Sequence, residues 1–123
     1  MKDTVRKGNI TELKVQLRLL EMGYNVFVPI GDGNKIDLIA IKDGSIDRIQ
    51  VKTSRMCRNV YIFNAYSTSR TRSLNGKKPK VKYTKNDIDY MATFKNEEFY
   101  LIPIEVILSI EPRLHQFKEY IAG

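Results

Sequence analysis

Apolar residues recur at helical spacing near the beginning of the chain. The row consists of Ile10, Leu13, Leu17 and Leu20. Side chains three or four positions apart lie on one side of an α-helix, and a glycine commonly follows the last helical residue, as Gly23 would here. The pattern predicts a first helix over residues 9–22, with this row as its apolar stripe.

The segment that follows shows the shorter period of β-strands. The run 25–30 predicts a short edge strand, and two further apolar runs, 35–41 and 46–53, flank the sequence KDGS. Asp-Gly is a favoured pair for a two-residue type I′ turn between antiparallel strands. We therefore predict a hairpin in which Lys42 faces Ser45, so that residues whose numbers add up to 87 lie opposite each other.

Downstream of this hairpin the pattern is less regular. We expect strands at 60–63 and 99–104, a polar loop at 65–83 and a short helix at 84–90. Thr84, followed three positions later by Asp87, resembles the capping box that opens helices. The run 104–114 is compatible with either strand or helix, and the last ten residues are compatible with a helix. No repeat divides the chain and its length suits one hydrophobic core, so we expect a single domain over residues 1–123.

Charge is distributed very unevenly along the chain, whose formal net charge is +7. No acidic residue occurs between Asp47 and Asp87, and this basic block contains eleven lysines and arginines. The rest of the sequence has ten basic and fourteen acidic residues, a net charge of −4. Such a block is typical of proteins that bind a polyanion, although a solvated surface kept for solubility is the alternative.

Composition argues against several other classes of protein. A single cysteine, Cys57, cannot close an internal disulfide, and with a single histidine, His115, it cannot complete a four-ligand zinc site. Neither residue has a neighbouring partner for nucleophilic hydrolysis. The sequence has no run of eighteen apolar residues and no apolar leader, so we expect a cytoplasmic protein without a membrane role.

The hairpin brings three polar side chains together. In the predicted register Asp37 lies opposite Gln50, and strand alternation places Lys52 on the same side. Asp37 and Gln50 offer oxygen ligands to Mg²⁺, with Mn²⁺ as a substitute, and such an ion neutralises a phosphate and acidifies a bound water. Lys52 would orient that water or stabilise charge on the phosphate. The three residues therefore predict phosphodiester hydrolysis.

Glu12 is a fourth candidate and a third possible metal ligand. It stands at the margin of the apolar stripe of the first helix, where it could face the same polar patch. The alternative is an ordinary glutamate near the positive end of the helix dipole. For Asp37 the alternative is a plain ion pair with Lys35 or Lys52, although aspartate is depleted in strands.

These residues carry a resemblance to a known family. The segment from Lys7 to Arg55, which contains Glu12, Asp37 and the triplet Gln50-Val51-Lys52, resembles the catalytic core of the PD-(D/E)XK nuclease superfamily. In particular, it is similar to a small single-domain branch that includes intron-encoded homing endonucleases, with archaeal Holliday-junction resolvases as more distant relatives. The similarity continues in YTKNDIDYMATF and YLIPIE.

Two positions depart from the family pattern. Ile36 stands where the family name has proline, and Gln50 replaces the usual glutamate, which removes one negative charge from the metal site. The resemblance implies an α/β fold with a restriction-endonuclease-like mixed β-sheet of about five strands flanked by helices. It also implies a homodimer or homotetramer and a catalytic set of Glu12, Asp37, Gln50 and Lys52.

The basic block follows the predicted site directly and would contact DNA. Its candidate DNA-binding residues are Arg55, Arg58, Arg70, Arg72, Lys77, Lys78, Lys80 and Lys82. Tyr61, Tyr66 and Tyr83 lie among them and are predicted to pack half-buried, with base or sugar stacking as the alternative. Three functions remain open: a Mg²⁺-dependent endonuclease that cuts duplex DNA as homing or restriction enzymes do, a nuclease selective for branched DNA such as Holliday junctions, and a non-catalytic DNA-binding module.

Overall fold

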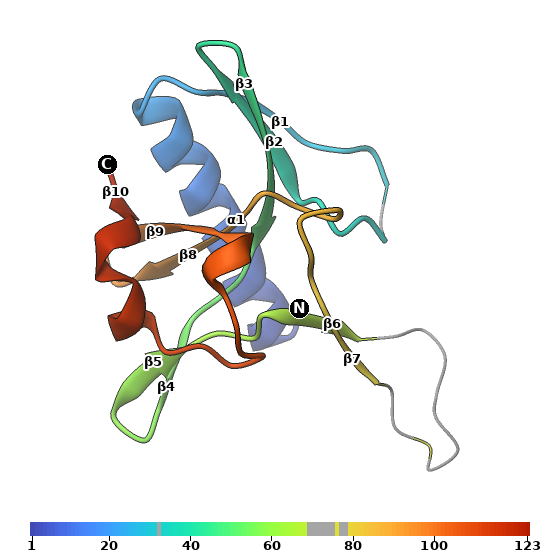
Figure 1. The fold of residues 1–123 in the computed structure, drawn as a ribbon, viewed down its shortest axis with the longest axis vertical. Coiled ribbons are helices and arrows are strands. Elements are labelled where there is room, and N and C mark those ends of the chain that lie inside the picture. Colours follow the sequence, from blue (N-terminus) through green and yellow to red (C-terminus); the bar gives the residue numbers. More distant parts are fainter. Residues whose placement is uncertain (32, 69–75, 77–78) are drawn as a thin grey trace.

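The computed structural model describes residues 1–31, 33–68, 76 and 79–123 and contains a six-stranded mixed sheet (Figure 1). The strand order is β1-β2-β3-β8-β9-β10, and β3 pairs with β8 in parallel while the other neighbours are antiparallel. The expected α/β class with a mixed sheet flanked by helices is confirmed, with six strands instead of about five. The elements are α1 (Asp3–Glu21), β1 (Asn25–Phe27), β2 (Leu38–Lys42), β3 (Ser45–Val51), β4 (Arg55–Cys57), β5 (Val60–Ile62), β6 (Tyr66–Thr68), β7 (Lys80–Lys82), β8 (Tyr90–Lys95), β9 (Glu98–Pro103), the 3₁₀ helices η1 (Ile104–Val106) and η2 (Leu114–Tyr120), and β10 (Ile121–Ala122).

The predicted hairpin forms between β2 and β3. Its register runs from Lys42↔Ser45 to Leu38↔Ile49, as the sequence indicated. Asp43 and Gly44 have φ values of 50° and 82°, the positive values that both central residues of a type I′ turn require. The turn chemistry therefore fixes which residues of the two strands face each other.

Helix α1 differs from its prediction in two ways. It begins at Asp3 instead of Asn9, because Gly8 is tolerated inside the helix at a cost of about 1 kcal/mol relative to alanine. The predicted apolar stripe is also not the buried face: Leu13 and Leu17 are 65% and 58% exposed, whereas Val15 and Leu19 are fully buried against the sheet. Gly23, with a φ of 93°, ends the helix as predicted.

The sheet is covered on both faces, with α1 on one and η2 on the other (Figure 1). The core under α1 consists of Val15, Leu19, Leu38, Ala40, Ile49, Val51, Ala92, Phe94 and Phe99. The core on the other face consists of Phe63, Ala65, Tyr83, Ile88, Met91, Tyr100, Ile102, Ile104, Ile107, Leu114 and Phe117. Thr53 is exposed, because it lies beyond the end of β3.

The region between β3 and β8 contains more regular structure than expected. The polar stretch predicted as a loop contains the paired strands β6 and β7, and β4 pairs with the predicted strand β5. The two hairpins project from the end of the sheet opposite the β2–β3 turn (Figure 1). Within the described residues, no helix is long and apolar enough to span a membrane.

The predicted helix at 84–90 does not form. The capping contacts are present, since the Thr84 N–H donates to Asp87 Oδ2 at 2.9 Å and the Ile88 N–H donates to the Thr84 carbonyl at 3.2 Å. The chain then turns into β8, because the Asp89 N–H donates to the Arg48 carbonyl of β3 at 2.8 Å. Strand β8 lacks alternation because Met91 to Phe94 are all buried, so it gave no recognisable strand pattern. The last ten residues are helical only in η2.

Candidate active site

Asp37 lies where β2 begins and stands at the centre of the candidate site. The β2–β3 ladder ends at Leu38, so the backbone of β3 beyond Ile49 has no strand partner on this side. Asp37 takes that place: its N–H donates to the Ile49 carbonyl at 2.9 Å, and its Oδ2 accepts from the Val51 N–H at 2.8 Å. The predicted cross-strand pair of Asp37 with Gln50 is therefore replaced by hydrogen bonds to the residues on either side of Gln50.

Gln50 presents an acceptor that nothing else in the described structure satisfies. Its Oε1 is buried and has no hydrogen-bond partner among the described residues. A buried acceptor without a partner costs about 1–3 kcal/mol and requires an explanation. Asp37 bonds to the backbone on both sides of Gln50, so the backbone of Gln50 lies beside Asp37.

Lys52 is held beside this region by the β6–β7 hairpin. Its Nζ donates to the Tyr66 carbonyl at 3.1 Å and lies 5.2 Å from the centre of the Tyr83 ring. Burial lowers the pKa of the Lys52 ammonium, and the nearby charge of Asp37 raises it in part. Lys52 therefore lies close enough to Asp37 for the two charges to interact, as the sequence indicated. The alternative partner, Lys35, instead lies 3.2 Å from Asp87.

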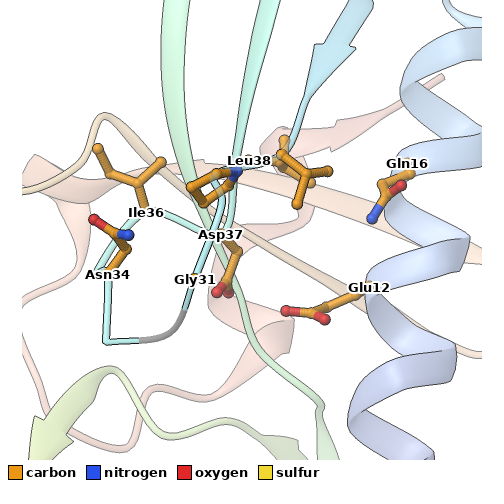
Figure 2. Close-up of a pocket in the computed structure, with 9 residues that line it drawn as sticks. Glu12, Gln16, Gly31, Asn34, Ile36, Asp37 and Leu38 are labelled. Carbon is orange, nitrogen blue, oxygen red and sulfur yellow. The ribbon is translucent and has the colours of Figure 1, made fainter.

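Glu12 reaches the same region from α1. Its carboxylate and that of Asp37 point toward one another (Figure 2). Burial raises the pKa of Glu12 and the charge of Asp37 raises it further. The pKa of Asp37 is also raised by burial, against the lowering effects of the Val51 N–H and of Lys52. The hydroxyl of Thr53 donates to that of Thr11 at 3.0 Å, which ties α1 to the chain directly after Lys52.

The two carboxylates border a cavity of about 380 Å³ between α1 and the chain leading into β2 (Figure 2). Its lining residues are Glu12, Gln16, Val28, Pro29, Gly31, Asn34, Ile36, Asp37 and Leu38. Gln16 and Asn34 were not among the predicted site residues. Gln16 follows Glu12 by four positions, so helical periodicity places it on the same side of α1. Asn34 lies in the loop before β2 and carried no such signal.

The residues present fit a hard divalent cation. Two carboxylates and one amide oxygen are the kind of ligand that such ions prefer, and the ions retain several waters. The Gln50 Oε1 lacks a partner among the described residues, and burial raises the pKa of both carboxyl groups, an effect that a nearby cation would oppose. No group of three or more His, Cys, Asp or Glu side chains that could hold a metal occurs in the described part of the chain. The fit therefore depends on the amide of Gln50.

The predicted DNA-binding residues divide between the two hairpins. Arg55 and Arg58 lie on or beside β4, and both are exposed. Lys80 and Lys82 are exposed on β7, where the Lys82 Nζ donates to the Leu108 carbonyl at 2.9 Å. Arg70, Arg72, Lys77 and Lys78 lie outside the described residues.

Each of the three tyrosines in the basic block carries a lysine over its ring. Lys95 lies 5.3 Å from the ring centre of Tyr61, and Lys80 lies 4.9 Å from that of Tyr66. Tyr61 and Tyr66 are half-buried, as predicted, and Tyr83 is buried beneath Lys52. Tyr83 thus supports a candidate catalytic residue, a role that its sequence context did not reveal.

An α/β sheet whose end carries two carboxylates, an amide and a lysine beside basic hairpins has the architecture of a nuclease core. The profile of the PD-(D/E)XK endonuclease family matches residues 2–118, and the chain belongs to this family. The predicted resemblance is thereby confirmed.

Two individual proteins show the same relationship. Protein 5.3 of Escherichia phage T7 is 36% identical over 47 residues, which are 38% of this chain and 40% of that protein. The match thus spans about two fifths of the length of this curated relative. The structure is similar to that of the bacterial homing endonuclease I-Ssp6803I, with a TM-score of 0.78 and 28% sequence identity. That similarity covers 92% of this chain and 78% of the other.

Proposed function

We propose that this protein is a Mg²⁺-dependent endonuclease that hydrolyses phosphodiester bonds in duplex DNA. The observation that carries the proposal is that the Glu12 and Asp37 carboxylates point toward one another, with Lys52 close to Asp37, at the end of the sheet from which two basic hairpins project. Membership of the PD-(D/E)XK endonuclease family and the likeness to a homing endonuclease support it.

Each of the four residues has a role that follows from its surroundings. Asp37, Gln50 and Glu12 would hold Mg²⁺, which when bound neutralises the phosphate and acidifies a water. Asp37 is oriented by the Val51 N–H, so one carboxylate oxygen is fixed and the carboxylate cannot rotate freely. Lys52 holds the attacking water or a phosphate oxygen through its Nζ. Burial lowers the pKa of this ammonium, so Lys52 gives up a proton more readily than an exposed lysine does.

The basic hairpins would hold the duplex over this site. Lysines and arginines bind the phosphates of DNA without regard to sequence and fix its position. The β6–β7 hairpin also supplies the Tyr66 carbonyl that binds Lys52, and Tyr83, directly after β7, supplies the ring beneath it. The same hairpin would therefore contact the DNA and position Lys52.

A non-catalytic DNA-binding module is the second candidate, and one observation favours it. Gln50 contributes no charge, so the site has one negative charge fewer than a site with glutamate and a lower affinity for the cation. The substitution Gln50→Glu separates the two functions. If the wild type is an active enzyme, it should cleave DNA, and the variant should bind Mg²⁺ more tightly than the wild type does. If the wild type is a binding module that never binds the metal, only the variant should cleave DNA.

The decisive experiment is incubation with three substrates in parallel: a randomised duplex library, supercoiled plasmid and a synthetic four-way junction. Cleavage should require Mg²⁺ or Mn²⁺ and stop with EDTA, and the mapped ends should come from duplex DNA. Lys52→Ala should stop cleavage while leaving DNA binding, and Lys118→Ala, at an exposed position on η2, is the matched control. Cleavage of the junction alone would instead identify a structure-selective enzyme, and intact DNA in all three reactions would identify a binding module.

A further inference from the structure

Helix α1 has apolar side chains on two opposite sides. Val15 and Leu19 pack against the sheet and are fully buried. The other side carries four large apolar residues, which we call the outer stripe. These residues and their exposed fractions are Ile10 51%, Leu13 65%, Leu17 58% and Leu20 56%. A surface helix normally turns a polar side to water, and a continuous exposed apolar patch marks a surface that another molecule covers.

The spacing of the outer stripe identifies the kind of partner. Its members are separated by three, four and three positions, which is the narrow seam of a helix that packs along another helix. This spacing is the same in both directions along the helix. The stripe is therefore complementary to itself when two copies of α1 run antiparallel, with Leu13 of each copy beside Leu17 of the other and Ile10 beside Leu20.

The charges beside the stripe agree with this pairing. Lys7, Lys14 and Glu21 border it on one side, and Asn9 and Gln16 on the other. Antiparallel packing places Lys7 of each copy near Glu21 of the other, which gives two attractive pairs. Lys14, near the centre, is turned toward its own subunit, because its Nζ donates to the Asn96 carbonyl at 3.2 Å and lies 4.5 Å from the Phe94 ring centre.

A parallel pair would not have this complementarity. It would place Asn9 beside Lys14 and Gln16 beside Glu21, with no opposite charges across the seam. We therefore propose that the outer stripe is the contact between two copies of this chain, packed as an antiparallel pair of α1 helices around a twofold axis.

The antiparallel dimer would also place its two candidate sites on one side, a step that rests on the proposed function, whereas the helix contact itself does not. In an antiparallel pair, the same border of each helix lies on the same side of the dimer. The border that carries Gln16 is also the side of α1 from which Glu12 reaches the candidate site. The two sites would thus open on one side of the dimer, where each could act on one strand of the same duplex.

Sedimentation of the metal-free protein over a concentration series, without DNA, tests the contact itself. The wild type should pass from monomer to dimer with rising concentration. The double variant Leu13→Glu/Leu17→Glu should remain a monomer with an unchanged circular dichroism spectrum, since both side chains are exposed. Leu108→Glu, at a position 80% exposed outside α1, is the matched control and should still form dimers. A monomeric wild type, or a double variant that still forms dimers, would overturn the proposal.

Disulfide linkage tests the direction of the helices in the background Cys57→Ser. Antiparallel packing predicts that a Leu13→Cys copy links preferentially to a Leu17→Cys copy when the two are mixed under oxidising conditions. Linkage of each variant mainly to itself would show a parallel pair and contradict the proposal. Neither experiment uses cleavage as its readout, so a failure of the proposed nuclease activity would leave both results interpretable.

Discussion

Strand β3 carries two polar clusters that lie a few residues apart and differ in how their charges are satisfied. At Arg48, the side chain donates to Asp89 Oδ2 at 3.1 Å and to the carbonyls of Lys85 and Asn86 at 2.7 and 3.0 Å. The pKa of Asp89 is lowered, first by its hydrogen bond with Arg48. The charged groups of this cluster thus satisfy one another. Their hydrogen bonds hold β3 to the chain before β8.

The cluster at Gln50 shows the opposite pattern. The pKa values of Glu12 and Asp37 are raised, first by burial, and the Gln50 Oε1 has no partner among the described residues. Groups whose charged forms are disfavoured in the free protein commonly mark functional sites. The comparison shows that polar groups that satisfy one another mark a structural position of β3, whereas raised carboxyl pKa values and an unpartnered amide oxygen mark the candidate site.

The largest effect is expected for Asp37→Asn, which tests whether the cluster at Gln50 is functional and not structural. We expect cleavage to fall about 1,000-fold, which corresponds to about 4 kcal/mol of transition-state stabilisation. The asparagine carbonyl can still accept from the Val51 N–H, and the substitution removes a buried charge, so the melting temperature of the metal-free protein should not fall. Cleavage rates and thermal melts at neutral pH check both statements. A drop of several degrees would show that the carboxylate is structural.

The reciprocal change is Asp89→Ala in the satisfied cluster. We expect it to lower the free energy of unfolding, because the side chain and the backbone N–H of Arg48 both lose their acceptor. Cleavage per folded molecule should change less than about twofold, since Asp89 lies outside the candidate site. Denaturant unfolding measures the first quantity and titration of active protein the second.

This stability difference should depend on pH in a defined direction. The pKa of Asp89 is lowered in the folded protein, so its contribution is present above the unfolded value of about 3.9. The contribution disappears as the pH falls through the folded pKa. Wild type and Asp89→Ala should therefore converge in stability at strongly acidic pH, and a constant difference would refute this assignment.

The substitution Glu12→Gln should change the pH dependence of metal binding, an effect smaller than the changes in cleavage and stability described above. Cations bind the ionised carboxylates, so protons compete with the metal at pH values below the raised pKa values of Glu12 and Asp37. Metal affinity should therefore fall with decreasing pH in the wild type. The variant should bind the metal more weakly but with a shallower pH dependence. Calorimetric titration with Mn²⁺ at several pH values measures both, and parallel pH profiles would remove Glu12 from the site.

The smallest effect is expected for DNA affinity when lysines of the β6–β7 hairpin are replaced. The double variant Lys80→Ala/Lys82→Ala should weaken binding to all duplex sequences alike. The slope of log affinity against log salt should become shallower by about 1.8, because each phosphate that is no longer neutralised by a lysine reduces it by about 0.9. Lys118→Ala provides the control. An unchanged slope would exclude β7 from the DNA interface.

The local structure of this protein follows from short stretches of its sequence. The Asp-Gly turn determined the register of β2 and β3 from Lys42↔Ser45 to Leu38↔Ile49, because both central residues adopt the positive φ of a type I′ turn. This register brings Asp37 beside the end of β3, where it bonds to Ile49 and Val51. Glu12 could be proposed only through the family resemblance and a helical pattern, because no local rule states where α1 docks.

The tertiary structure decided which of two apolar sides α1 buries, where the 84–90 segment turns, and which charges are satisfied. Periodicity identifies an apolar row but not which side of a helix packs against the rest of the protein. In the fold, Val15 and Leu19 are buried, whereas Leu13 and Leu17 are exposed. The capping contacts at Thr84 form, yet parallel pairing with β3 offers β8 more burial than a short helix could. Burial and partnership arise from segments distant in the chain, and these long-range contacts distinguish Arg48 as a structural residue from Gln50 as a candidate ligand.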